Sequence, residues 1–257
     1  MAQPLKRRPF QGVWTVIRFN WHLHAIALAA IVVLLAGAVF LTVPTALICA
    51  VLAVSAVFSV ALSLLATWHA YDASGLYQTD WLAPEMESAR HAANIHAGFD
   101  ETTVILKSGF PDIEWKVFDF FDPVKHTEIS IRRARKAHPP SPDTMAIHTE
   151  RIPLEDGSLD RALLILAAHE IRDHGERAGF FRELKRVLAP GGRVIVTEHL
   201  RDLANIAAYS IGAWHFHSRA EWLASFEAAG FHVAREIRNN LLLTTFILEA
   251  DANTNTP

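Results

Sequence analysis

The pattern of apolar and polar positions divides the chain into two unlike parts near residue 70. Between Arg18 and Asp72 there is no Asp, Glu, Lys or Arg, and most positions are apolar. A single helix of that length would extend about 80 Å, whereas the apolar core of a bilayer needs only about 30 Å. Pro44 stands near the middle of the segment. We therefore expect two membrane-spanning helices, within residues 21–68, with a tight turn at Pro44.

Positive charge flanks this expected hairpin at its start and is absent from its turn. Residues 1–20 contain Lys6, Arg7, Arg8 and Arg18. By the positive-inside bias, a basic N-terminus and both helix ends face the cytoplasm, with Trp21 and Trp68 as interfacial anchors. A cleaved signal peptide would have a shorter apolar region, and a buried soluble hairpin would show polar positions at helical spacing. The pattern therefore predicts a multi-pass anchor in the inner (cytoplasmic) membrane, with the rest of the chain in the cytoplasm.

Residues 69–90 form an aromatic and polar connector with two possible interpretations. The favoured interpretation is a juxtamembrane surface segment at the level of the lipid headgroups, where aromatic residues are common. The other interpretation is a lid over an active site, which would bring Tyr71 and Tyr77 near a cofactor or substrate.

Short apolar runs alternate with amphipathic segments from residue 91 to residue 250. The run 159–167 is almost continuously apolar, as a strand buried on both faces requires. Such alternation predicts an α/β domain with a mostly parallel sheet and helices on both faces. The expected strands cover residues 91–96, 114–118, 144–148, 159–167, 193–198, 232–238 and 243–249. The expected helices cover residues 101–109, 126–138, 176–188 and 219–229. Residues 251–257 are polar and are expected to be a disordered tail.

Composition narrows the function classes. The net charge of −3 gives no sign of a nucleic-acid partner, and the single cysteine, Cys49, excludes a disulfide framework and a thiolate zinc site. Fourteen histidines raise the question of a metal site. However, His169 and His174 are five residues apart and do not form a His-Glu-x-x-His motif, and His215 and His217 stand on a separate segment. Because metal ligands need defined spacing, we predict no metal site.

Three sequence blocks resemble small-molecule class I S-adenosylmethionine-dependent methyltransferases of the methyltransferase-11 type. The blocks are residues 152–160 (IPLEDGSLD), 180–193 (FFRELKRVLAPGGR) and 222–231 (WLASFEAAGF), in the family's order and spacing. The resemblance covers about residues 91–250. It implies a Rossmann-like fold with a mostly parallel seven-stranded sheet, a terminal antiparallel hairpin, and S-adenosylmethionine as the cofactor.

The family's first motif is an acidic residue followed by three alternating glycines, and here it falls on Asn94, His96, Gly98 and Asp100. Only Gly98 keeps the family residue. The resemblance implies that Gly98 lets the backbone approach the methionine moiety of the cofactor and that Asn94 and His96 contact the cofactor. The loop has few glycines, so it must adopt another shape.

The resemblance assigns further cofactor contacts downstream. Asp119, at the end of the second strand, would accept hydrogen bonds from the ribose hydroxyls, and Phe120 would pack on the adenine. His148 falls where the family often has an Asp beside the adenine. Ala168 and His169 match the segment that lines the substrate side of the cofactor.

His169 and His199 are the candidate catalytic residues, as general bases, because imidazole titrates near neutral pH. His199 and Glu198 end the fifth strand, and ligands bind at the carboxyl ends of strands in open α/β sheets. An equally weighted alternative is that Glu198 forms a loop salt-bridge cluster with Arg201 and Asp202.

The sequence thus predicts a membrane-anchored methyltransferase that acts on a small, lipophilic acceptor. Its partners would be the bilayer and a small-molecule or lipid-like substrate. The alternative is a catalytically inactive membrane scaffold or binding subunit with a methyltransferase fold, which the glycine-poor loop favours. A third possibility is that the chain keeps the cofactor but uses it for other chemistry.

Overall fold

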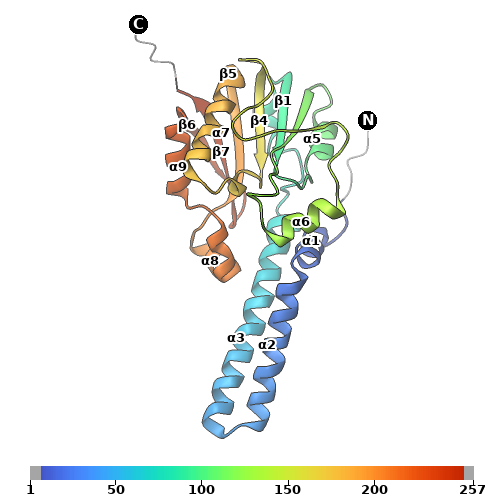
Figure 1. The fold of residues 1–257 in the computed structure, drawn as a ribbon, viewed down its shortest axis with the longest axis vertical. Coiled ribbons are helices and arrows are strands. Elements are labelled where there is room, and N and C mark those ends of the chain that lie inside the picture. Colours follow the sequence, from blue (N-terminus) through green and yellow to red (C-terminus); the bar gives the residue numbers. More distant parts are fainter. Residues whose placement is uncertain (1–6, 252–257) are drawn as a thin grey trace.

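Two apolar helices project side by side from one end of a sheet domain in the computed structural model, which describes residues 7–251 (Figure 1). Helix α2 spans Trp21–Phe40 and helix α3 spans Val43–Trp68, so the turn falls two residues before its predicted position. Pro44 lies in the first turn of α3, where its missing N–H breaks no intrahelical hydrogen bond. Both helices are long and apolar enough to cross a membrane, with a mean hydropathy of 2.6.

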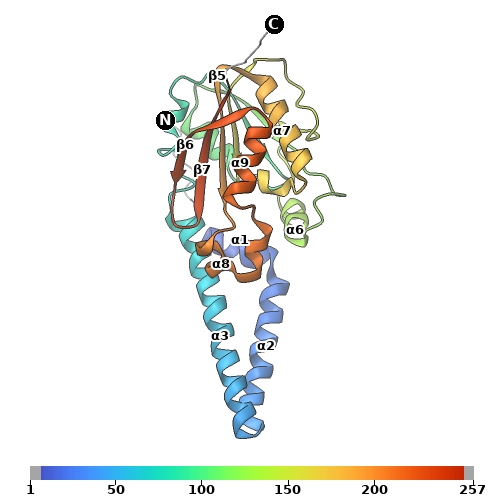
Figure 2. The same ribbon diagram turned by 90° about the vertical axis from the view of Figure 1, so that its left-hand side faces the viewer.

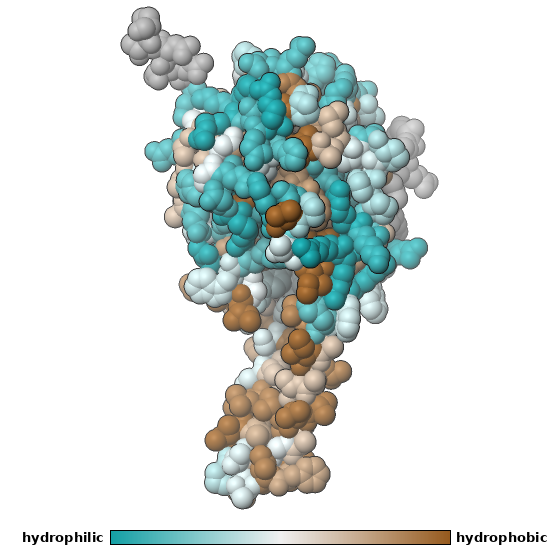
Figure 3. Space-filling view, viewed as in Figure 1, coloured by the Kyte–Doolittle hydropathy of each residue, from teal (hydrophilic) through white to brown (hydrophobic). Residues whose placement is uncertain are grey.

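The surface of this stalk is apolar, whereas the surface of the sheet domain is largely polar (Figure 3). Large side chains point away from the helix pair, including Val33, Val39 and Phe58, which are each about two-thirds exposed or more. None of the most apolar stretch of α2 is buried within the protein. An apolar surface of this extent is typical of a segment that another apolar phase or a partner covers.

The sheet domain contains seven strands in the order β3-β2-β1-β4-β5-β7-β6. The strands are β1 His91–His96, β2 Glu114–Asp119, β3 Thr144–Ala146, β4 Leu159–Ile165, β5 Leu188–His199, β6 Phe231–Arg238 and β7 Leu243–Ala250. Strands β1 to β5 pair in parallel, and β7 runs antiparallel to both β5 and β6. The predicted Rossmann-like methyltransferase fold, with its terminal antiparallel hairpin, is confirmed.

Helices cover both faces of the sheet, because the side chains of each strand point to the two faces in turn and apolar side chains lie on both. Successive side chains of β4 point to opposite faces, so Leu164 joins one core and Leu163 joins the other. The first core packs against α7 (His174–Val187) and α9 (Arg219–Ala228), and the second packs against α4 (Ala83–Met86) and α5 (Thr103–Gly109). Ser218 caps helix α9 and forms a capping box with Glu221.

Several elements were not predicted, and two of them, the helices labelled α1 and α8, lie between the sheet and the stalk (Figure 2). They are α1 (Gln11–Phe19), the π-helical turn η1 (His69–Ala73), α4, the 3₁₀ turn η2 (Ala168–Glu170), α8 (Leu203–Tyr209) and the 3₁₀ turn η3 (Ser210–His215). Helix α6 (Ile129–Ala137) is shorter than predicted, and β5 begins five residues earlier, at Leu188. Apart from Asp251, the expected disordered tail lies outside the described residues, as does Lys6.

Helix α1 is tied to the segment that follows the stalk. The carboxylate of Asp72 accepts hydrogen bonds from the backbone N–H groups of Gly12 (2.8 Å) and Val13 (3.1 Å). These N–H groups have no partner inside a helix, so a carboxylate at this place stabilises α1. A side chain at Gly12 would place its Cβ only 2.5 Å from Tyr71 Cβ. The connector is therefore not a plain surface segment, because its Leu76 is buried in the second core.

Candidate active site

A cavity of about 250 Å³ lies at the carboxyl ends of the parallel strands, beneath helix α1. Open α/β sheets bind their ligands at this edge. The side chains and glycine that border it come from α1, the connector, the loop after β1, α6 and the ends of β4 and β5. They include Gly12, Thr15, Val16, Phe19, Tyr71, Tyr77, His96, Phe99, Glu101, Thr102, Ile131, Leu166, His169, Glu170, His199 and Phe216.

His96 is the one predicted cofactor residue that borders this cavity. It ends β1, its side chain is 5% exposed, and neither ring nitrogen has a hydrogen-bond partner within the described residues. Its Nδ1 lies 3.7 Å from Oδ1 of Asp119, beyond hydrogen-bond distance. Burial lowers the pKa of His96 below the ordinary value of 6.5, so the ring is neutral at neutral pH. A buried ring with free nitrogens is costly unless a ligand supplies the missing partner.

Asn94 shapes the loop rather than facing the cavity. Its amide donates to the hydroxyls of Thr102 (3.0 Å) and Thr103 (2.7 Å). Asp100 accepts from the backbone N–H groups of the same two threonines and so caps α5. Two polar side chains thus hold the loop in a shape that does not require the family's glycines.

The carboxylate of Asp119 is already paired within the protein. Its Oδ1 accepts from the backbone N–H groups of Gly98 (2.8 Å) and Phe121 (2.9 Å), and its Oδ2 pairs with Arg135. The side chain is only 2% exposed. The guanidinium of Arg135 also lies over the ring of Phe121, 4.6 Å from its centroid. Ribose hydroxyls would reach this acid only if Arg135 moved.

The other predicted cofactor residues lie away from the cavity wall. Gly98 has a φ of +83°, and a Cβ there would lie 2.8 Å from the ring of Phe121, so the close approach is to protein. Phe120 is buried in the first core against Phe180. His148 is exposed, and Ala168 is fully buried in η2.

His169 borders the cavity, and a buried carboxylate orients its ring. Its Nδ1 lies 2.7 Å from Oε2 of Glu198, and its backbone N–H donates to Oε1 of the same residue. Burial disfavours the charged ring, but Glu198 and Glu170 outweigh this effect and raise the pKa of His169 to about 10. His169 is therefore an imidazolium at neutral pH and suits donation to an oxygen better than the predicted base role.

Glu198 therefore does not join the alternative loop cluster. Its side chain is fully buried. Arg201 pairs instead with Glu221 (2.7 Å), and Asp202 caps α8 by accepting from the N–H of Asn205. The three side chains of that predicted cluster have separate partners.

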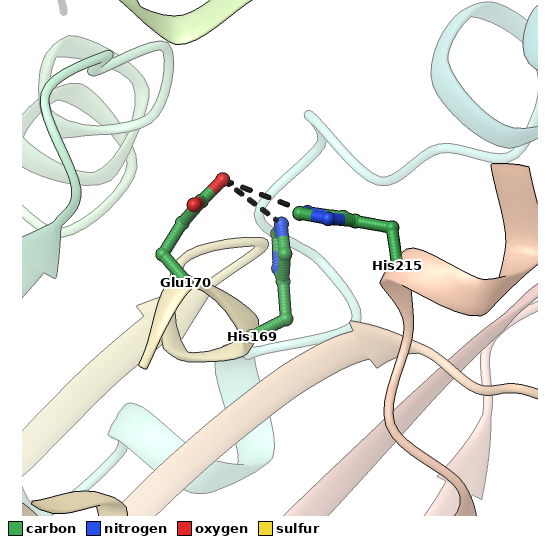
Figure 4. A group of neighbouring side chains, drawn as sticks. All are labelled: His169, Glu170 and His215. Atoms are coloured by element: carbon green, nitrogen blue, oxygen red, sulfur yellow. Dashed lines mark ion pairs between the residues drawn. The ribbon is translucent and has the colours of Figure 1, made fainter. Parts of the chain in front are cut away.

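His215 approaches His169 from η3, and the carboxylate of Glu170 faces both rings from one side (Figure 4). The Oε1 of Glu170 lies 3.5 Å from Nε2 of His169 and 3.7 Å from Nε2 of His215. The Nδ1 of His215 lies 2.7 Å from Oε1 of Glu128. Burial disfavours the charged ring of His215, but Glu128 and Glu170 raise its pKa, while the two histidines hold the pKa of Glu170 below its usual range. Sequence spacing could not predict this group, because Glu128 and His215 come from distant segments.

His199 is buried beside the cavity with both ring nitrogens bonded. Its Nδ1 faces two acceptors, Oδ1 of Asn205 and the carbonyl of Leu242, each at 3.0 Å, so Nδ1 carries the proton. The Nε2 then accepts from the hydroxyl of Tyr71 at 2.8 Å. Burial lowers the pKa of His199 to about 4, so the ring is neutral at neutral pH.

Two further polar residues, Glu101 and Tyr77, border the cavity. No role was assigned to Glu101 from the sequence, and Tyr77 was placed near a ligand only if the connector is a lid. Glu101 accepts from the hydroxyl of Tyr77 (3.0 Å) and pairs with Arg7 (3.2 Å). The guanidinium of Arg7 lies 3.5 Å from the centroid of the Tyr77 ring. Burial, followed by the charge of Glu101, raises the pKa of Tyr77 well above its ordinary value. The only sequence signal was the aromatic composition of the connector, which also fits an interfacial segment.

The sequence family that matches this chain is described as a methyltransferase domain (Methyltransf_11), and the match covers residues 123–196. This stretch includes β3, β4, α7 and most of β5, together with His169 and Glu170. No curated protein matches the chain.

Solved structures share the fold at low sequence identity. The PH0226 protein from Pyrococcus horikoshii OT3 is 13% identical with a TM-score of 0.52, covering 70% of this chain and 91% of that protein. The [4+2]-cyclase SpnF is 16% identical with a TM-score of 0.50, covering 69% and 81%. An S-adenosylmethionine-dependent methyltransferase from Aquifex aeolicus is 16% identical with a TM-score of 0.49, covering 69% and 93%. The family match indicates a methyltransferase domain over residues 123–196, and the solved structures show that the fold of the sheet domain is shared.

Proposed function

We propose that this protein is a membrane-anchored methyltransferase that transfers the methyl group of S-adenosylmethionine to a small lipophilic acceptor drawn from the bilayer. The observation that carries the proposal is the place of the cavity: it is roofed by α1 and η1, the two elements that directly flank the apolar helices. In this account residues 21–68 form the anchor, residues 69–90 close the site, and residues 91–250 form the catalytic domain on the cytoplasmic side of the inner membrane.

The first support for the anchor is the apolar stalk. A helix that is apolar on all sides belongs in lipid or in a protein core, and only 0% and 6% of the most apolar stretches of α2 and α3 are buried within the protein. Arg7, Arg8 and Arg18 stand before α2, and the turn between the helices has no charge. This distribution favours an orientation with the sheet domain in the cytoplasm.

The second support is the contact between α3 and the segment α8–η3. The hydroxyl of Ser210 lies 3.4 Å from the hydroxyl of Ser59, which is nine positions before the end of α3. If α3 spans the bilayer, a segment in contact with Ser59 would lie at the level of the membrane surface, and η3 begins at Ser210. The neighbouring Leu203, Ile211 and Trp214 are 86%, 87% and 66% exposed, as residues that insert into lipid would be.

The cavity fits the cofactor in position and in its polar lining. His96 offers two free nitrogens, and Thr102 and Glu101 offer oxygens on the same wall. These residues would hold the amino-acid part of the cofactor. Asp119 would hold the ribose after Arg135 moves aside. When bound, the cofactor supplies an electrophilic methyl group on a sulfonium.

The protein's own residues would position the acceptor and handle its proton. Phe216 stacks on His199 at 4.7 Å between centroids and borders the cavity with Leu166, which gives the acceptor an apolar wall. The neutral ring of His96 can accept a proton, whereas the charged ring of His169 can donate a hydrogen bond to an acceptor oxygen. Methyl transfer depends mainly on such positioning, with at most one general base.

The proposal is tested by supplying labelled S-adenosylmethionine to the full-length protein in vesicles made from a total lipid extract. We expect label to enter the organic-soluble fraction, and we expect Ile211→Asp to reduce the rate by weakening contact with the bilayer. Met145→Asp, an exposed apolar residue on the edge strand β3, is the matched control and should leave the rate unchanged. The proposal is contradicted if no label enters the organic-soluble fraction. It is also contradicted if water-soluble acceptors, tested in detergent, are labelled as fast as lipids.

The internal pairing of Asp119 favours one alternative, a membrane scaffold or binding subunit that no longer binds the cofactor. In that case Arg135 would occupy the ribose site permanently. Calorimetry with S-adenosylhomocysteine separates the two functions, because the enzyme binds this product and the scaffold does not. Binding without methyl transfer to any extract fraction would instead favour other chemistry on the same cofactor.

A further inference from the structure

We propose that His169, Glu170 and His215 form a binding site for a divalent transition-metal ion on the wall of the cavity. The proposal rests on three features: the distances between the three possible ligand atoms, the carboxylates behind the two imidazole rings, and the contact between this group and the cavity. The three side chains come from η2 and η3 and converge on one point (Figure 4).

The distances suit a single ion. One ligand atom from each residue lies within 4.8 Å of the other two. The carboxylate oxygen of Glu170 is 3.5 Å and 3.7 Å from the two Nε2 atoms. In a tetrahedral site with metal–ligand bonds of about 2.0–2.1 Å, neighbouring ligands lie about 3.4 Å apart. Small side-chain shifts would therefore bring all three atoms to bonding distance.

The carboxylates behind the rings orient the free nitrogens toward this point. The Nδ1 of His169 faces Glu198, and the Nδ1 of His215 faces Glu128, both at 2.7 Å. A carboxylate at Nδ1 keeps the proton there and favours Nε2 as the ligand, which is the usual outer shell of metal-binding histidines. Because the ring of His169 is charged in the ion-free protein, binding of the ion would release the proton of its Nε2. The side chain of Glu198 is fully buried, and both of its hydrogen bonds within the described residues are to His169.

The backbone around the site is also held in place. The guanidinium of Arg172 donates to the carbonyls of both His169 and His215. It therefore clamps η2 to η3, two segments separated by more than forty residues in the sequence. A preformed site of this kind loses less entropy on binding than one assembled from free loops.

Two imidazoles and one carboxylate indicate the class of ion. Nitrogen ligands suit zinc, iron, cobalt and nickel, whereas calcium and magnesium prefer oxygen ligands alone. His169 and Glu170 both border the cavity, so a fourth position on the ion would be open to a ligand there. An open position of this kind is typical of catalytic sites. The role of that position rests on the proposed function: an oxygen of the methyl acceptor would bind there and be polarised by the ion, which would replace the hydrogen bond that His169 donates in the ion-free site.

The test uses the full-length protein in detergent, stripped with a chelator and then titrated with Zn²⁺ by calorimetry. We expect one high-affinity site per chain. Cobalt chloride should give the intense visible bands of a four-coordinate ion. Glu170→Gln and His215→Ala should each weaken Zn²⁺ binding by at least 100-fold, and Glu128→Gln, which removes only the orienting carboxylate, by about 10–100-fold.

His174→Ala is the matched control, because this exposed histidine lies close in sequence but outside the group. It should leave Zn²⁺ binding unchanged. The proposal is overturned if the stripped protein binds no Zn²⁺, or if Glu170→Gln and His215→Ala, still folded by circular dichroism, bind it as tightly as the original chain. Zn²⁺ binding by a protein that fails to bind S-adenosylhomocysteine would support the metal site and contradict only the proposed function.

Discussion

The two halves of the cavity edge, one at the ends of β1 and β2 and the other at the ends of β4 and β5, differ in the hydrogen-bond partners of their polar side chains. At the ends of β1 and β2, Asn94, Asp100 and Asp119 bond to the protein's own backbone and side chains. At the ends of β4 and β5, ring nitrogens of His169 and His215 point at one carboxylate. His96, the last residue of β1, has no hydrogen-bond partner for its ring nitrogens in the described part of the chain.

This difference indicates a division of labour. In the first half, side-chain hydrogen bonds replace the conformational freedom that glycines give to the loop in the family. That half is therefore stable without a ligand, and a cofactor must displace Arg135 to use Asp119. The second half keeps polar groups close together at a cost in desolvation, as functional sites do. Stability measurements should distinguish the two halves.

The largest expected effect on stability is at Asp119, in the half of the cavity edge formed by the ends of β1 and β2. Asp119→Ala removes a buried acceptor from two backbone N–H groups and from Arg135. We expect it to lower the free energy of unfolding by about 3 kcal/mol, because buried donors and a charge lose their partner. Denaturant titration in detergent, followed by tryptophan fluorescence, measures this change. A loss below about 1 kcal/mol would show that Asp119 has no such structural role.

The next effect is a pH dependence of the free energy of unfolding, which arises from histidines that are buried in their neutral form. Burial lowers the pKa of His199 to about 4 and that of His217 to about 3, whereas the unfolded chain titrates near 6.5. Below pH 6.5 the unfolded state binds protons that the folded state does not, so stability falls as pH decreases from about 6.5 toward 4. Each histidine contributes a slope of about 1.4 kcal/mol per pH unit.

Denaturant titrations at several pH values between 4.5 and 7 check this slope. His199→Gln should reduce the slope of the unfolding free energy against pH by the contribution of one histidine, about 1.4 kcal/mol per pH unit. The raised pKa of His169 does not interfere, because its contribution is complete below 6.5 and is lost only as pH rises toward about 10. Equal stability at pH 5 and pH 7 would contradict the neutral state of these rings.

A smaller effect is expected where α1 meets the connector. Gly12→Ala places a Cβ 2.5 Å from Tyr71 Cβ, and we expect a cost of about 1–3 kcal/mol from overpacking. Hydrogen exchange should then become faster at the amides of α1. Gly212→Ala is the matched control, because its nearest neighbour would be at 3.7 Å. Equal exchange in both variants would mean that α1 does not depend on this close approach.

The smallest change in stability is expected at His96. His96→Leu removes two buried nitrogens that have no hydrogen-bond partner among residues 7–251, so the free energy of unfolding should stay the same or rise slightly. Binding of S-adenosylhomocysteine should nevertheless weaken, as measured by calorimetry. A clear loss of stability would reveal a structural role for His96, and unchanged binding would remove it from the cofactor site.

The sequence predicted the fold because its signals are local and periodic. The apolar run of β4 and the Ser218 cap of α9 determine those elements from their own residues. The positions of the short helices α1 and α8 depend on contacts across the chain, such as Asp72 with Gly12, which no local pattern predicts. The site was harder to predict for the same reason. Glu170 reaches His215 only after folding, and the resemblance could not indicate that Arg135 pairs with Asp119.

The most direct test of the central claim is calorimetric titration of the full-length protein with S-adenosylmethionine, compared with Arg135→Ala. If the cavity is a methyltransferase site whose ribose acid is covered by Arg135, the original chain binds one equivalent. Removing the guanidinium frees Oδ2 of Asp119 and tightens binding. Absence of binding in both proteins would contradict the methyltransferase account and leave the membrane scaffold as the function.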